Sequence, residues 1–274
     1  MRRRCLLLLM AILPCTLAAC EGGPPKTALS YTEDAKRAYD SAMETFNAHS
    51  WIEAQTLLRE VKRKYSYSKY ARLAELRIAD ADYEQEKYPE AIHEYKDFIH
   101  AHRADAEDVA YARGRIADAM YAEIPDSALA PASEERDQAS VVDAYKEVKS
   151  YLADYPASKD APHVRDLLSA VLARLIKHEL YVARFYLKKD NYDAAVARIK
   201  YALRNYTSEG EATDGAEGNA LQAEALLLLG QTYLRMQNWA EARRAFQQIV
   251  QAYARTTVAV QARDYLEFLG RRGA

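Results

Sequence analysis

LLLLGQTYLRMQNWAEARRAFQQIVQAY, residues 226–253, contains two stretches of apolar periodicity separated by a short polar break. Apolar side chains that recur every three or four residues on both sides of such a break are typical of two antiparallel α-helices. The small residues Gly230 and Ala242 lie twelve positions apart and would let the two helices approach closely. The large residues Tyr233 and Phe246 would fill the space beside them.

This segment resembles the tetratricopeptide repeat (TPR), whose pattern is W-x-x-L-G-x-x-Y on the first helix and A-x-x-x-F on the second. Four weaker copies precede it. The small residues of the first helices are Ala42, Ala79, Gly114, Ala183 and Gly230, and the alanines of the second helices are Ala54, Ala91, Ala144, Ala195 and Ala242. The two positions lie twelve residues apart in four of the five units, and the third unit carries an insert between its helices.

The fold class expected from these repeats is all-α, a right-handed α-solenoid of five TPR-like helix pairs with a C-terminal capping helix. The units are expected at residues 32–66, 68–104, 105–157, 160–207 and 219–254, with the insert at 124–137 and the cap at 257–270. The first helix of unit four should be long, from about Pro162 to Lys189. Only nine glycines and eight prolines occur, which disfavours a turn-rich β-sandwich or barrel.

The N-terminus has the features of an export signal. A basic start is followed by an uncharged stretch from Cys5 to Ala19, too short to span a bilayer. Leu17-Ala18-Ala19-Cys20 resembles the bacterial lipobox, which predicts a signal peptide at 1–19, an acylated Cys20 and a flexible tether at 20–31. The alternative is ordinary signal cleavage beside a chance cysteine. Loss of Cys5 and Cys15 with the signal would leave one cysteine, which excludes disulfide and zinc–thiolate chemistry.

No catalytic, metal or cofactor site is expected. The chain has no Walker A loop, no GxGxxG and no GxSxG motif, and His178-Glu179 misses the HExxH zinc motif because residue 182 is valine. The only covalent group expected is the lipid on Cys20. A net charge of −2 gives no basic field for nucleic acid.

A peptide-binding groove is expected on the inner surface, which the first helix of each unit lines. The residues predicted to face it are Tyr39, Met43 and Phe46 in unit one, Asp80 and Tyr83 in unit two, and Tyr111 and Arg115 in unit three. Aromatic and apolar side chains beside a few charges suit an extended peptide. The alternative is that some of these side chains fill gaps between repeats.

Several segments together resemble one family, the BamD/ComL lipoproteins of the outer-membrane β-barrel assembly machine. They are Trp51-x-x-Ala54, Tyr111–Gly114, Glu135–Gln138 in the insert, His178–Tyr186 and Ala194–Arg198. The resemblance extends over residues 32–206.

The resemblance implies a non-enzymatic scaffold that is lipid-anchored to the cell outer membrane and faces the periplasm. It implies that the C-terminal repeats bind a BamA-like barrel subunit, with Arg198 near that contact, and that the N-terminal repeats bind unfolded outer-membrane proteins. Other lipoproteins of the machine are further expected partners. The alternatives are another TPR lipoprotein scaffold, for pilus assembly or cell-envelope and division coordination, and a periplasmic enzyme with a TPR tail, for which the repeats leave no room.

Overall fold

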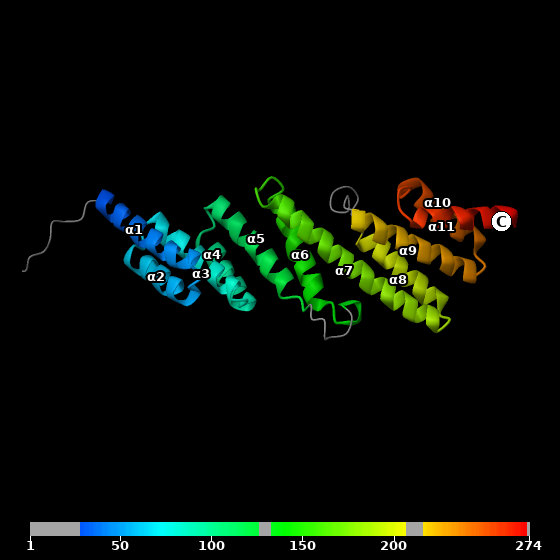
Figure 1. The fold of residues 1–274 in the computed structure, drawn as a ribbon, viewed down its shortest axis with the longest axis horizontal. Coiled ribbons are helices and arrows are strands. Elements are labelled where there is room, and N and C mark those ends of the chain that lie inside the picture. The colour runs from blue at the N-terminus through cyan, green and yellow to red at the C-terminus, as the bar shows by residue number, and fades with distance from the viewer. Residues whose placement is uncertain (1–27, 126–132, 207–215, 273–274) are drawn as a thin grey trace, which may run out of the picture.

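A computed structural model describes residues 28–125, 133–206 and 216–272, and in these ranges every regular element is helical (Figure 1). The helices are α1 (Ala28–Asn47), α2 (Trp51–Lys64), α3 (Lys69–Glu84), α4 (Tyr88–Ala101), α5 (Ala106–Ala122), α6 (Ala139–Asp154), α7 (Ala161–Lys188), α8 (Tyr192–Asn205), α9 (Ala216–Arg235), α10 (Trp239–Ala252) and α11 (Val258–Arg271), with a 3₁₀ turn η1 (Ser133–Glu135) before α6.

The helices form an elongated array in which α1 and α11 lie at opposite ends (Figure 1). Each helix packs against its neighbours in the chain, and α1, α5, α7 and α9 also touch the next helix but one. The pairs α1/α2, α3/α4, α5/α6, α7/α8 and α9/α10 are the five expected units, and α11 covers α10 and α9. Contacts restricted to near neighbours define a solenoid, so the all-α TPR architecture is confirmed.

The helix bounds differ from the expected units at two points. α1 begins at Ala28, so residues 28–31 belong to the first helix and not to the tether. α9 begins at Ala216, three residues before the expected start of unit five. The long first helix of unit four spans Ala161–Lys188, close to its expected range.

Four segments lie outside the described residues: 1–27, 126–132, 207–215 and 273–274. The first contains the expected signal peptide and Cys20, and the second contains half of the predicted insert. The predicted acylation of Cys20 therefore stays a prediction.

The same backbone turn joins the two helices in units one, two, four and five. It contains one residue in the left-handed region, namely His49 (φ 59°), Glu86 (φ 60°), Asp190 (φ 56°) or Gln237 (φ 59°). In unit two the Glu86 N–H donates to the Tyr83 carbonyl and the Lys87 N–H donates to the Asp82 carbonyl, both at 2.9 Å. These bonds satisfy the last carbonyls of the first helix, a role that glycine commonly serves. The repeated turn accounts for the constant twelve-residue spacing.

The small residues at the centre of each helix pair are all buried. At Gly230 a Cβ atom would overlap the ring of Phe246 on the facing helix. That ring is itself stacked on Tyr265 of α11, with centroids 4.7 Å apart and an 8° angle between the planes. Gly230 is therefore required by the close approach of the two helices, because any larger residue would push the Phe246 ring against Tyr265.

The apolar core is divided into three clusters along the array. The first lies within α1–α3, the second within α3–α5, and the third extends from α5 to α11. α3 contributes Ala74 and Ile78 to the first cluster and Leu76 and Ala79 to the second. Because α3 is buried on two sides, it joins units one and two into one body.

Gly230→Ala is expected to lower the free energy of unfolding by about 1–3 kcal/mol, because overpacking displaces the stacked Phe246 ring. Gly114→Ala is the matched control, since its Cβ would meet Tyr151 at an ordinary 3.6 Å. That change should be neutral or stabilising by up to about 1 kcal/mol, because alanine favours helix over glycine. Urea unfolding followed by circular dichroism measures both. Equal effects at the two positions would contradict the close approach at Gly230.

Candidate partner-binding surfaces

A buried charge cluster lies at the junction of units two and three. Asp80 on α3 is only 3% exposed and accepts hydrogen bonds from the hydroxyls of Tyr95 on α4 and Tyr111 on α5. The Tyr111 hydroxyl lies 2.9 Å from both carboxylate oxygens. Arg77 pairs with the same carboxylate, and Arg115 Nε lies 3.6 Å from Oδ1. One carboxylate thus connects three helices.

The protonation states in this cluster follow from burial and charge. Burial raises the pKa of Tyr111 and of Tyr95, and the nearby Asp80 carboxylate raises both further. Both phenols therefore stay neutral and donate to Asp80 at physiological pH. The two guanidinium groups keep the carboxylate paired, which is the condition for burying a charge. We call Arg77, Asp80, Tyr95, Tyr111 and Arg115 the Asp80 cluster.

The structure corrects the expected role of Asp80. It was predicted to face a peptide groove, but it lies in the interior and binds Tyr111, another predicted groove residue. Tyr83 is half-buried, and the Arg115 guanidinium lies 3.9 Å from its ring centroid. Arg115 also pairs with Asp118 at 3.3 Å. Arg115 thus forms the partly exposed edge of the Asp80 cluster, and Tyr83 packs on it.

The groove residues predicted in unit one pack between helices. Tyr39, Met43 and Phe46 are partly buried against the first core cluster. The Phe46 ring meets Trp51 edge-to-face at 4.9 Å, and Tyr39 lies 5.7 Å from Tyr70. These contacts agree with the alternative that side chains on this face fill gaps between helices.

A cavity of about 280 Å³, lined mainly by polar and charged residues, lies next to the Asp80 cluster, between α5 and α7. Tyr111, Gly114 and Arg115 line one side, and His163 at the start of α7 lies opposite. His163 Nε2 is 2.6 Å from Asp118 Oδ1, so the ring bridges the two helices. Sequence reasoning missed this contact because 45 residues separate the partners.

Arg198 on α8 is paired within the chain. Its Nη1 lies 3.3 Å from Oε2 of Glu179 on α7, whose side chain is 7% exposed, while the Arg198 side chain is 45% exposed. Tyr181 and Phe185 are exposed further along α7. The guanidinium therefore holds a buried carboxylate and still presents donors to solvent.

The described parts of the insert pack against α7. His178 Nδ1 lies 2.7 Å from the carbonyl oxygen of Glu134 in η1. Arg174 and Arg136 both donate to the Pro125 carbonyl, at 3.0 and 2.6 Å. His178 is thus engaged in fixing the insert. Within the described residues, no group of three or more His, Cys, Asp or Glu side chains could hold a metal ion.

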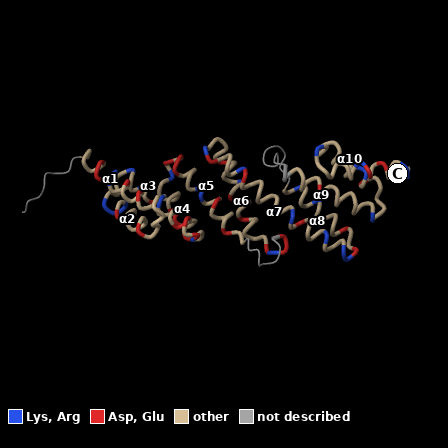
Figure 2. Tube along the Cα trace, in the orientation of Figure 1, with Lys and Arg blue, Asp and Glu red and all other residues tan. Residues whose placement is uncertain are grey.

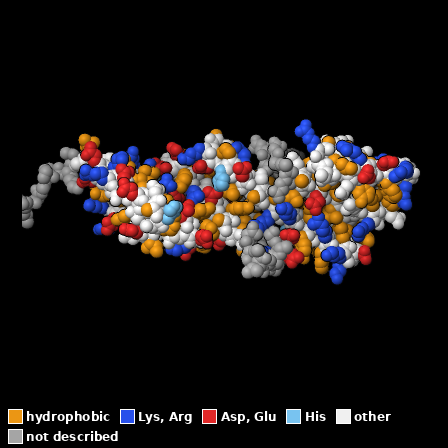
Figure 3. Space-filling model, viewed as in Figure 1, with side chains coloured by type: hydrophobic (Ala, Val, Ile, Leu, Met, Phe, Trp, Pro, Cys, Tyr) orange, Lys and Arg blue, Asp and Glu red, His pale blue; other side chains and the backbone are white. Residues whose placement is uncertain are grey.

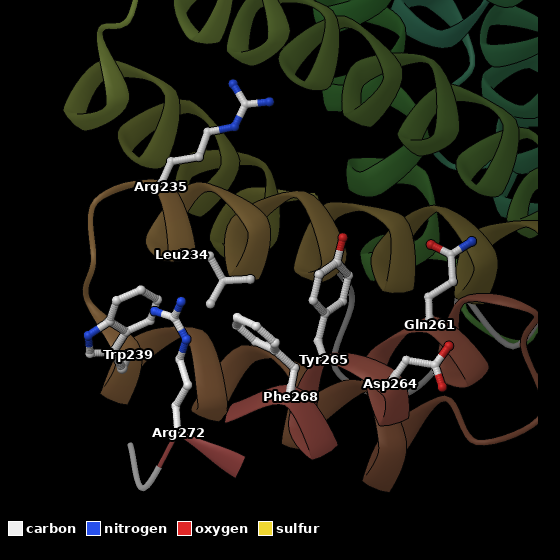
Figure 4. Close-up of a pocket in the computed structure, with 8 residues that line it drawn as sticks. All are labelled: Leu234, Arg235, Trp239, Gln261, Asp264, Tyr265, Phe268 and Arg272. Atoms are coloured by element: carbon white, nitrogen blue, oxygen red, sulfur yellow. The ribbon is translucent and has the colours of Figure 1, made fainter. Parts of the chain in front are cut away.

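A larger groove, of about 700 Å³, lies where α11 covers α9 and α10 (Figure 4). Its lining is Leu234, Arg235, Trp239, Gln261, Asp264, Tyr265, Phe268 and Arg272. The Arg272 guanidinium lies 5.5 Å from the Trp239 ring and 5.0 Å from the Phe268 ring. The sequence predicted a capping helix here but not a groove, because the helical pattern does not show how far α11 stands from α9.

Charges of both signs are interspersed along the array, and hydrophobic patches lie between them on the visible face (Figures 2 and 3). No helix in the described ranges is both long and apolar enough to cross a bilayer.

Comparison with known proteins agrees with this architecture. Residues 32–231 match the YfiO family, described as an outer membrane lipoprotein, and residues 224–256 match a tetratricopeptide repeat family. Several relatives carry the name outer membrane protein assembly factor BamD. The relative from Caulobacter vibrioides is 26% identical over 230 residues, which cover 84% of this chain and 70% of the relative. Those from Xylella fastidiosa (strain 9a5c) and Neisseria gonorrhoeae are 23% and 25% identical over 73% of this chain, and 66% and 77% of their own lengths.

Asp80→Asn is expected to lower the free energy of unfolding by about 3–5 kcal/mol, because it leaves two partly buried guanidinium groups without their shared carboxylate. The control is Asp40→Asn, which removes an exposed carboxylate paired with Lys36 at 2.5 Å. An exposed pair contributes less than about 1 kcal/mol, so this control should change little. Urea unfolding measures both, and hydrogen exchange should rise first in α3–α5. A loss no greater than that of the control would show that the cluster does not stabilise the junction.

Proposed function

The chain belongs to the YfiO family of outer membrane lipoproteins, and on this basis we propose that it is a non-enzymatic scaffold for the assembly of outer-membrane β-barrel proteins. Its BamD-named relatives carry that role in their printed names. In this proposal a lipid on Cys20 anchors the chain to the outer membrane, and the array faces the periplasm.

The observation that supports the proposal most strongly is the extent of the family match. It covers residues 32–231, from the second turn of α1 into α9, and so includes nearly all of both helices of units one to four. The insert of unit three and the α7 segment on which it packs lie inside the matched range. A generic TPR scaffold would need neither feature.

We assign binding of the BamA-like subunit to the exposed face of α7 and α8. Arg198 uses one N–H group on Glu179, and a guanidinium has five donors, so it can also bind a partner carboxylate. Glu179 fixes the position of the guanidinium, which lowers the entropy lost on binding.

We assign binding of unfolded outer-membrane proteins to the inner surface of units one to three. Tyr39 and Tyr83 are partly exposed there, and Arg115 borders the cavity between α5 and α7. An extended peptide could contact the rings through its apolar side chains and the cavity through its backbone carbonyls. Tyr111 and Asp80 would act only by holding Arg115 in place.

Arg198→Gln should weaken binding to the BamA-like subunit by more than tenfold, since loss of a charged interface contact costs about 2–5 kcal/mol. Glu179→Gln removes the same internal ion pair but keeps the guanidinium. It should lower the melting temperature. The affinity should change by no more than about threefold, well under the roughly 1.4 kcal/mol of a tenfold change, because the guanidinium that binds the partner is still present. Calorimetry with the detergent-solubilised subunit measures both affinities, and thermal melts report folding.

If the two variants lose affinity in parallel with stability, Arg198 has only a structural role. Arg244→Gln serves as a control on unit five, because Arg244 is exposed and pairs with Glu241 at 2.5 Å. It should not change the affinity.

The substitutions Tyr39→Leu and Tyr83→Leu should together lower the affinity for an unfolded outer-membrane-protein peptide by more than about fivefold, because interface tyrosines are frequent hot spots. Leucine preserves most of the packing volume. Tyr201→Leu is the matched control, since Tyr201 is exposed on α8, away from units one to three. Fluorescence anisotropy of a labelled peptide measures the affinities. Unchanged binding in the double variant would place the peptide elsewhere.

A further inference from the structure

Three chain segments meet at one end of unit one. The first turn of α1 lies beside the end of α2, since the rings of Tyr31 and Tyr65 are 5.4 Å apart. The turn to α3 follows directly, and Lys69 begins that helix. This end belongs to the unit at the left-hand extremity of the array (Figure 1).

Two large apolar side chains are exposed at this end. Leu29 is 71% exposed and lies two residues before Tyr31, while Tyr67 is 96% exposed and lies two residues after Tyr65. The contact between Tyr31 and Tyr65 therefore places both exposed side chains at the same end. Single exposed apolar residues are common on protein surfaces, so their meaning depends on what surrounds them.

Basic side chains surround them. Arg63 and Lys64 end α2, Lys69 starts α3, and all three are exposed without an ion-pair partner among the described residues. The Lys64 and Lys69 ammonium groups lie 5.4 and 5.2 Å from the ring centroids of the tyrosines that follow them. The left-hand end of Figure 3 shows hydrophobic and basic atoms close together, with acidic atoms among them.

Three acidic residues lie near this end. Asp34 on α1 pairs with Arg37 at 2.5 Å, while Glu33 on α1 and Glu60 on α2 are exposed. The third basic residue at the end of α2, Lys62, pairs with Glu75 at 3.6 Å. The unpaired charge at this end is therefore positive on balance, although the whole chain carries −2.

The position of this end relative to a membrane follows from chain length. Ala28, the first residue of α1, is eight residues after Cys20. A fully extended chain spans at most about 3.5 Å per residue, so a lipid on Cys20 holds the start of α1 within about 28 Å of the bilayer. No other unit of the array is restricted to the surface in this way.

We propose that the end of unit one formed by Leu29, Arg63, Lys64, Tyr67 and Lys69, the unit-one tip, binds the anionic phospholipid surface of the membrane that carries the anchor. Basic side chains near such a surface are attracted to it, and tyrosine and leucine favour the headgroup region. The tip thereby gives the array a second contact with the membrane and so fixes its orientation. This inference goes beyond the assembly role. It rests on the proposed lipid anchor at Cys20, but not on Arg198 or on the proposed peptide-binding surface of units one to three.

The test uses the mature chain, residues 20–274, with Cys20→Ser, so that only the protein surface can bind. It should sediment with vesicles of two parts phosphatidylethanolamine to one part phosphatidylglycerol and not with phosphatidylcholine vesicles, and added salt should release it. Lys64→Glu and Lys69→Glu should each lower the partition coefficient by at least about fivefold. Lys188→Glu with Lys189→Glu, on exposed lysines at the far end of α7, is the matched control and should have no effect.

A second measurement uses the acylated protein, in which Cys20 is blocked and no other cysteine remains after residue 19. A nitroxide label on Tyr67→Cys should be relaxed by lipid-soluble oxygen more than by a water-soluble nickel complex. The same label on Gln237→Cys, in the turn between α9 and α10, should show the reverse. Equal water accessibility at the two positions would overturn the proposal. So would binding that is unaffected by the lysine substitutions, or a failure to bind anionic vesicles at all.

Discussion

Two antiparallel helices can touch along their length only where neither presents a bulky side chain, and each helix pair of this array meets at such a position. The alanines and glycines at these positions are buried, and at Gly230 even one added carbon would overlap Phe246. The left-handed residue at the end of the first helix sets the register that brings the two small positions together. Four units use this turn without glycine, so the surrounding packing must stabilise a conformation that costs about 1–2 kcal/mol per residue.

Different side chains fill the space beside the point where the two helices of each unit touch. Four residues after the second-helix alanine, unit two has Tyr95 and unit five has Phe246. Tyr95 donates to the buried Asp80, whereas Phe246 stacks on Tyr265. The same position is therefore part of a polar cluster at one junction and of an apolar stack at another. The polar junction demands a specific geometry, because an unpaired buried charge is far more costly than an imperfect apolar contact.

Much of the fold could be predicted from sequence because the repeat spacing reflects a single repeated turn. Most of the candidate site could not. A charged residue next to the small position Ala79 suggests exposure in a groove, yet Asp80 is buried. Only the structure shows that Tyr111 and Arg115, more than thirty residues later, close over it. The pairing of Arg198 with Glu179 was likewise missed, because the exposed half of the arginine and its buried partner lie on different helices.

The junctions also determine how distant surfaces are related. In this array each unit touches only its neighbours. The orientation of the α7–α8 face relative to unit one is therefore determined by the angles between the units that lie between them. The Asp80 cluster forms the junction between units two and three, and His163 with Asp118 connects unit three to α7. A contact of unit one with the membrane would therefore orient Arg198 only if these polar junctions are rigid. The buried charge of Asp80 adds little to stability compared with an apolar core, and it is better explained by the fixed angle that its cluster imposes.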